Sequence, residues 1–133
     1  MNKALIVEDD ADLRNMVALA ARCCGLEPIS AATLADAISL LQGGPCAAVL
    51  TDLQLPDSGG THTLRALRAA DGDAILVAVT GSGLATQKLR QCGAEAVIRK
   101  PFTLDELRAE LVRVLDAHPG RTASRIGDSP RAE

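Results

Sequence analysis

Five polar residues lie one or two positions after apolar segments that have the character of short buried strands. They are two consecutive acids, a third acid, a threonine and a lysine: Glu8, Asp9, Asp52, Thr80 and Lys100. A carboxylate at the mouth of a buried strand is costly unless a cation or a covalent modification neutralises it. Asp52 follows the apolar run 47–50 and opens a loop rich in Pro, Asp and Gly. We therefore take Asp52 as the residue around which the other four are arranged.

These residue types together fit phosphate chemistry assisted by a metal. Two carboxylates about 4 Å apart repel by roughly 1 kcal/mol in water and by about 4 kcal/mol at an intermediate dielectric constant. One lysine offsets only part of the repulsion among three carboxylates, whereas an oxygen-preferring divalent cation, most simply Mg²⁺, would resolve it. Aspartate acts as a nucleophile in aspartyl-phosphate chemistry. With Asp52 in that role, the metal and Lys100 would neutralise phosphoryl oxygens, and the Thr80 hydroxyl could hydrogen-bond one of them.

The rest of the sequence predicts the elements that bring these residues together. Apolar, strand-like segments alternate with segments whose apolar residues follow helical spacing. The strand-like segments are 4–7, 26–31, 47–50, 75–79 and 96–98. The helical segments are 11–24, 34–42, 63–70, 84–92 and 104–115. Such alternation is typical of α/β proteins in which helices cover both faces of a parallel sheet.

Pro28 indicates the strand order. A proline removes a donor from the hydrogen-bond ladder, so the segment 26–31 belongs at a sheet edge. With right-handed crossovers, that placement predicts a doubly wound (βα)5 fold, a five-stranded parallel sheet of order 2-1-3-4-5 that is flavodoxin-like. Ligands bind beyond the carboxyl ends of the strands in such sheets, and all five polar residues are predicted to lie there.

Several other polar residues have local structural interpretations. Asp10 is expected to cap the first helix rather than to bind a metal. Asp57 is expected to be a loop residue. Arg99 is interpreted as a solvated side chain, and His62 as a surface residue of the third helix.

Composition limits the class of function. Of the 133 residues 47% are apolar and 23% are charged, the net charge is −3, and the aromatic residues are a single Phe. These values suit a globular domain and disfavour direct nucleic-acid binding. No apolar run approaches the roughly 20 residues of a membrane span, and no signal peptide is evident. No membrane association and a cytoplasmic location are therefore expected.

The chain is predicted to hold one domain, residues 1–118, followed by a flexible tail at 119–133 that is rich in Gly, Arg, Ser and Pro. The four cysteines include no CxxC pair, and both histidines lie far from them in sequence. We interpret the cysteines as reduced thiols rather than as ligands of zinc.

Four short motifs occur in a specific order along the chain. They are Val7-Glu8-Asp9-Asp10, Asp52-Leu53-Gln54-Leu55-Pro56-Asp57 with Gly59, Thr80-Gly81, and Lys100-Pro101-Phe102. Together they resemble the receiver domain of two-component response regulators, and the resemblance covers residues 3–117. It implies that Asp52 accepts a phosphoryl group from a histidine kinase or a histidine phosphotransfer protein, with Mg²⁺ as the cofactor.

The resemblance also implies a set of metal ligands. Asp9 is similar to the acid that binds Mg²⁺ directly in the family, and Glu8 to the acid that assists, often through water. By the same resemblance, Asp52 is expected to be a metal ligand as well as the phosphoacceptor. Gln54, two residues after the acceptor, matches the position whose backbone carbonyl ligates the metal.

Thr80 matches the switch hydroxyl of the family and Lys100 the lysine that pairs with the phosphate, and the Lys100–Pro101 peptide is implied to be cis. One position departs from the pattern. The family usually has Tyr or Phe three residues before the lysine, where this chain has Val97. In the resembling proteins that aromatic ring swings inward as the threonine moves toward the phosphate, and a small, stiff valine cannot make the same swing. Coupling from Thr80 to the face made by the fourth helix, the fifth strand and the fifth helix is therefore expected to be weaker or rerouted.

The predicted function is that of a phosphorylatable signalling receiver, not of an enzyme, either as a stand-alone regulator or as part of a longer chain. Its expected partners are the phosphodonor and a downstream protein target, and a phosphorylation-dependent homodimer is a further option. Two alternatives stay open. A degenerate receiver would bind partners without phosphorylation. A phosphohydrolase of the haloacid-dehalogenase type would also use an aspartate after a parallel strand, but with a second acid where this chain has Gln54.

Overall fold

The computed structural model describes residues 2–118, and the tail predicted at 119–133 lies outside the described residues. Five strands pair in parallel in the order β2-β1-β3-β4-β5. They are β1 (Lys3–Val7), β2 (Glu27–Ala31), β3 (Ala48–Thr51), β4 (Ile75–Thr80) and β5 (Ala96–Arg99). This order confirms the predicted doubly wound (βα)5 fold, with the proline-bearing strand at an edge of the sheet.

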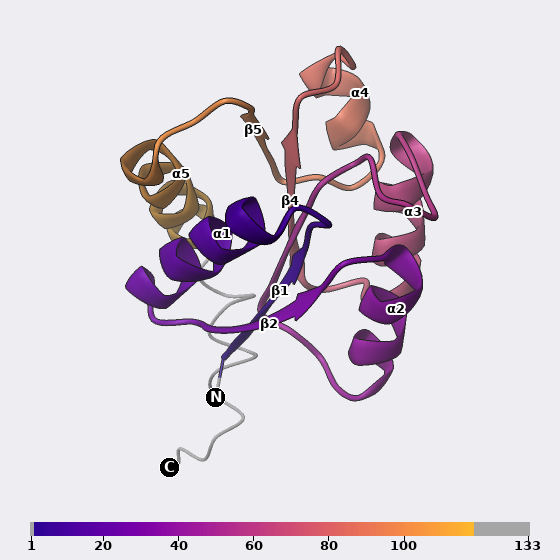
Figure 1. Cartoon of the computed structure of the whole chain (residues 1–133), viewed down its shortest axis with the longest axis horizontal. Coiled ribbons are helices and arrows are strands. Elements are labelled where there is room, and N and C mark those ends of the chain that lie inside the picture. Colours follow the sequence, from indigo (N-terminus) through magenta and orange to yellow (C-terminus); the bar gives the residue numbers. More distant parts are fainter. Residues whose placement is uncertain (1, 119–133) are drawn as a thin grey trace.

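Five helices alternate with the strands and cover both faces of the sheet. They are α1 (Ala11–Cys23), α2 (Leu34–Gln42), α3 (Thr61–Ala70), α4 (Thr86–Gln91) and α5 (Leu104–Ala117). Helices α1 and α5 lie on one side of the sheet, and α2, α3 and α4 lie on the other (Figure 1). The fourth helix is shorter than the sequence predicts, and the third begins two residues earlier.

Each helical layer packs on its own apolar cluster. The cluster under α1 and α5 includes Val17, Leu107 and Leu111, and the cluster under α2, α3 and α4 includes Leu64 and Leu89. The residues of β3 and β4 are buried throughout because these strands are covered on both faces, which explains their continuous apolar runs. Within residues 2–118, no helix is long and apolar enough to cross a membrane.

Local sequence signals set several helix starts. The Asp10 carboxylate accepts a hydrogen bond from the Leu13 amide at 3.0 Å, which confirms its predicted role as the N-cap of α1. At α5, Thr103 and Glu106 form a capping box in which each side chain accepts from the backbone amide of the other. His62 is exposed on α3, as predicted.

Asp57 does more than occupy a loop. Its carboxylate accepts hydrogen bonds from the amides of Leu34 at 2.8 Å and Ala35 at 3.0 Å, so the loop after β3 caps the N-terminus of α2. These two bonds hold the pKa of Asp57 below its ordinary value of 3.8. The positive end of the helix favours the ionised carboxylate. Asp57 therefore fixes the position of α2 relative to the loop that carries Asp52.

Asp57→Asn is expected to lower the melting temperature near neutral pH. The neutral asparagine side chain accepts hydrogen bonds from the backbone N–H groups of α2 more weakly than a carboxylate does. Because the pKa of Asp57 is lowered in the folded state, its carboxylate stabilises the protein at pH values above its ordinary pKa of 3.8. This stabilisation is lost as the pH falls through the folded-state pKa. Thermal unfolding of both proteins near neutral pH and in strong acid measures the difference. Asp116→Asn, a change at an exposed position of α5, is the control. If Asp57→Asn lowered the melting temperature by the same amount in strong acid as near neutral pH, the ionised carboxylate would not have this role.

Arg68 on α3 ties the helix to the starts of two strands. Its guanidinium donates to the carbonyls of Ala74 at 2.8 Å and Gly93 at 2.7 Å, and it pairs with the Glu95 carboxylate at 2.9 Å. Glu95 in turn accepts from the Leu76 amide at 2.7 Å. The two charged side chains are only 22% and 17% exposed, so this pair is largely shielded from water.

Arg68→Met is expected to destabilise the protein by about 2–4 kcal/mol, since it removes the positive partner of a mostly buried carboxylate and one donor to several carbonyls. Urea unfolding followed by circular dichroism gives the value. Arg65→Met, on the exposed side of the same helix, is the matched control and should change stability little. Equal losses in the two variants would show that the network around Arg68 adds nothing.

Candidate functional site

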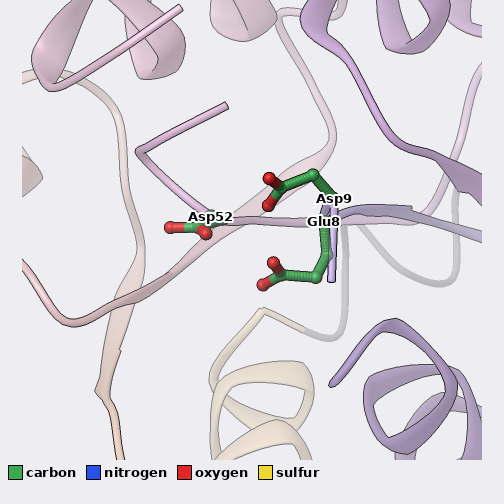
Figure 2. Close-up of side chains that lie close together, drawn as sticks. All are labelled: Glu8, Asp9 and Asp52. Carbon is green, nitrogen blue, oxygen red and sulfur yellow. The ribbon is translucent and has the colours of Figure 1, made fainter. Parts of the chain in front are cut away.

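The carboxyl ends of four strands bring the predicted site residues to one edge of the sheet. Glu8 follows β1, Asp52 follows β3, Thr80 is the last residue of β4, and Lys100 follows β5. Figure 2 shows the carboxylates of Glu8, Asp9 and Asp52 side by side. One oxygen from each of these three lies within 4.8 Å of the others.

Burial differs among the three acids. Glu8 and Asp52 are only 3% and 7% exposed, whereas Asp9 is exposed. The cluster therefore opens to solvent on the side of Asp9, which leaves an approach for a small ion or a phosphoryl group. The side-chain atoms that the cluster offers to a metal are all carboxylate oxygens, which suit a hard divalent cation such as Mg²⁺.

Lys100 is the cation that the fold itself supplies to the cluster. Its Nζ donates to Asp52 Oδ2 at 3.0 Å and to Glu8 Oε1 at 3.2 Å. Burial alone lowers the pKa of Lys100, but the hydrogen bonds and charges of Asp52 and Glu8 outweigh burial, and the net pKa is raised. Lys100 thus stays protonated and bridges two of the three acids. The Lys100–Pro101 peptide is cis, as the resemblance implies.

Glu8 is the acid most affected by its surroundings. Burial raises its pKa, the negative charge of Asp52 adds to this rise, and the hydrogen bond from the Asp10 amide together with Lys100 reduces it. The net pKa is raised. A further cation at the cluster would favour the ionised form of Glu8.

The loop that follows β3 holds the Asp52 side chain through a backbone amide. The Gln54 amide donates to Asp52 Oδ1 at 3.1 Å, while Oδ2 faces Lys100. The Thr63 hydroxyl of α3 donates to the Leu53 carbonyl at 3.1 Å and fixes the start of the loop. The Gln54 side chain folds over Gly59, where a Cβ would lie 2.8 Å from Gln54 Oε1, so a glycine leaves the room that this packing needs.

The Thr80 hydroxyl is buried and bonded within its own loop. Thr80 Oγ1 accepts a hydrogen bond from the Ser82 amide at 2.9 Å. Val97, the residue at the position usually aromatic in the resembling family, is half-buried against the core under α2, α3 and α4. Thr80 thus lies at the carboxyl end of β4, and Val97 lies beside Ala78, two residues earlier in that strand.

Arg99 is exposed, as its interpretation as a solvated side chain predicts, but it also makes contacts that the sequence does not indicate. Its guanidinium donates to the carbonyls of Ser82 and Leu84 and to the hydroxyl of Thr86. No local pattern in the sequence indicates these contacts, because they depend on the path of the loop between β4 and α4. Arg99 is the residue near the site that sequence reasoning missed.

Comparisons with known proteins agree with this geometry. The family model described as "Response regulator receiver domain" matches residues 4–112. The chain is 33% identical over 126 residues to the transcriptional regulatory protein BasR of Escherichia coli, covering 93% of this chain and 57% of BasR. It is 31% identical over 115 residues to the phosphate regulon transcriptional regulatory protein PhoB of Pseudomonas aeruginosa, covering 84% of this chain and 50% of PhoB.

The chain spans about half the length of these two curated relatives. Among solved structures, the chemotaxis response regulator CheY4 of Vibrio cholerae superimposes with a TM-score of 0.77 at 26% identity, covering 86% of this chain and 99% of CheY4. The family match extends over most of the described residues and includes every member of the acidic cluster. The chain therefore belongs to the response regulator receiver domains of two-component systems.

Proposed function

We propose that this chain accepts a phosphoryl group on Asp52 and thereby switches its protein-binding surface. The donor is the phosphohistidine of a histidine kinase or of a histidine phosphotransfer protein. One observation carries the proposal: Lys100 Nζ lies within hydrogen-bond distance of both Asp52 and Glu8, in a cluster of three carboxylates whose oxygens lie within 4.8 Å of one another. Such a site matches an anionic group that arrives with a divalent cation.

In the transfer step, a carboxylate oxygen of Asp52 forms a bond to phosphorus as the bond between phosphorus and the donor imidazole nitrogen breaks. Lys100 stays protonated and neutralises a phosphoryl oxygen. Glu8, Asp9, Asp52 and the backbone carbonyl of Gln54 would hold Mg²⁺, which when bound neutralises charge on the phosphoryl oxygens. The Gln54 amide keeps the Asp52 carboxylate in place during the attack.

Thr80 is assigned the switch role in this proposal. Its hydroxyl donates to a phosphoryl oxygen once Asp52 is modified, and it then leaves its present bond with the Ser82 amide. Val97 has two γ-methyl groups and no ring. It therefore cannot rotate inward as the aromatic side chain at this position does in the resembling proteins. The response near α4 and β5 therefore depends on other contacts.

The output of the proposed switch is a protein contact in the cytoplasm. The chain carries a net charge of −3, and its likeness to BasR and PhoB covers only about half of each of those transcriptional regulators. Direct nucleic-acid binding is therefore not assigned to these residues. A downstream protein, or a second copy of the chain after phosphorylation, is the expected partner.

Incubation with Mg²⁺ and acetyl phosphate tests the proposal, with intact-mass spectrometry as the readout. We expect the wild-type protein to gain one phosphoryl group, and we expect EDTA to prevent the gain. No modification with Mg²⁺ present would favour a degenerate receiver that binds without phosphorylation. Continuous multiple-turnover hydrolysis of a general phosphomonoester would favour a phosphohydrolase instead.

A further inference from the structure

One side chain of β5 holds the loop between β4 and α4. Arg99, the last residue of β5, donates from Nη1 to the Ser82 carbonyl at 2.9 Å. Its Nη2 donates to the Leu84 carbonyl at 2.6 Å and to the Thr86 hydroxyl at 3.1 Å. Thr86 is the first residue of α4. The guanidinium therefore connects the end of β5 to two residues of the loop, Ser82 and Leu84, and to the start of the helix.

The same loop determines where the Thr80 hydroxyl lies. The Ser82 amide donates to Thr80 Oγ1 at 2.9 Å, and the Ser82 carbonyl accepts from Arg99 at 2.9 Å. Ser82 thus uses its two backbone groups to join the hydroxyl to the guanidinium. A displacement of Ser82 toward or away from the site moves both connections together.

The start of α4 has apolar packing from Leu84 but no side-chain cap. The N-cap residue, Ala85, makes no side-chain hydrogen bond to the helix, and Leu89 is the buried residue of this six-residue helix. Val97 lies on the same face of β5 as Arg99, because side chains two residues apart in a strand point the same way. Val97 supplies only apolar packing to the core there. Arg99 makes the polar connection across this face.

We propose that Arg99 is a positioning residue that holds the β4–α4 loop in the arrangement in which Thr80 is bonded to the Ser82 amide. This inference rests on the proposed function, in which the Thr80 hydroxyl turns to the phosphoryl group. For that turn the loop must shift against three guanidinium hydrogen bonds. Arg99 therefore lowers the affinity of the site for a phosphoryl group, and it transmits the shift of Ser82 to α4.

Beryllofluoride, a mimic of the bound phosphoryl group, gives a direct test. Each protein is titrated with beryllofluoride at fixed Mg²⁺, and the amide resonances of Ser82 and Thr86 report binding. Arg99→Met keeps the aliphatic stem but removes the donors, and we expect about three- to tenfold tighter binding than in the wild type. Arg99→Lys should lie between the two, because one ammonium cannot span the acceptors of a guanidinium fork.

Two controls separate this role from a general loss of stability. Arg108→Met removes the same charge from an exposed position on α5 and should bind beryllofluoride as the wild type does. In a Thr80→Val background, Arg99→Met should change the affinity by less than about twofold, because the coupled hydroxyl is gone. Should Arg99→Met fold poorly, Thr86→Ala removes one acceptor from the α4 side and should tighten binding by about twofold.

Unchanged or weaker binding in Arg99→Met would overturn the inference, and so would a full gain in the Thr80→Val background. If the wild-type protein binds beryllofluoride and Arg99→Met binds it with the same affinity, only the role of Arg99 is refuted. Wild-type protein that fails to bind beryllofluoride with Mg²⁺ refutes the proposed function, and the role of Arg99 falls with it.

Discussion

Asp52→Asn is expected to abolish phosphorylation by acetyl phosphate and by a phosphohistidine donor. The amide is nearly the same size and still accepts from the Gln54 amide, which bonds Asp52 Oδ1 at 3.1 Å in the wild type. It lacks the anionic oxygen that attacks phosphorus, so the loss should be complete rather than partial. Intact-mass spectrometry after incubation with Mg²⁺ measures the modification.

Asp57→Asn is the matched control for this experiment. Asp57 lies in the same loop, and its carboxylate is turned to the N-terminus of α2 rather than to the acidic cluster. The control protein should still gain one phosphoryl group at a temperature where it is folded. Modification of Asp52→Asn to the wild-type extent would mean that another residue is the acceptor.

Lys100→Ala is expected to slow phosphorylation by about 100- to 1000-fold at saturating Mg²⁺. The wild-type ammonium is hydrogen-bonded to Asp52 and Glu8 and stays charged in the cluster. Removal of one such preorganised group from a largely buried site typically costs about 100- to 1000-fold in rate. Initial rates with acetyl phosphate, with phosphoprotein resolved by mass, give the comparison.

The lysine variants also separate charge from geometry. Lys100→Arg keeps the positive charge in a larger, planar group and should recover only part of the rate. Lys88→Ala, at an exposed position of α4, controls for the loss of a lysine elsewhere. A Lys100→Ala rate close to that of the wild type would rule out a role for this ammonium in the transfer step.

The fold could be predicted from the sequence because its main signals are local. The apolar run 75–79 is continuous because β4 is covered on both faces. Pro28 lies in an edge strand, where a missing amide donor is tolerated. Asp10 and the Thr103–Glu106 pair act on backbone amides within three residues, so their caps are visible in the sequence itself.

The proximity of the site residues was also predictable, since parallel strands deliver their carboxyl ends to one edge of the sheet. This rule brings Glu8, Asp52 and Lys100 together although they are far apart in sequence. The rule says where a strand ends but not which hydrogen bonds a side chain makes there. The bond between the Thr80 hydroxyl and the Ser82 amide was accordingly not foreseen.

Three contacts between distant segments had no signal in the sequence. Asp57 caps a helix that begins 23 residues earlier, Arg68 reaches a carbonyl 25 residues later, and Arg99 reaches back 17 residues to Ser82. In each case a charged side chain bonds backbone groups, which every residue has. Such a partner is determined by the three-dimensional path of the chain and not by residue type.

The brevity of α4 has a consequence for how receivers of this kind diversify. Helix α4 buries Leu89, while Gln87, Lys88 and Gln91 are exposed. Substitutions at these outward positions should leave the free energy of unfolding nearly unchanged, because little packing is lost. A duplicated gene could therefore acquire a new binding specificity through a few changes in this helix while the phosphorylation chemistry and the folded core remain intact.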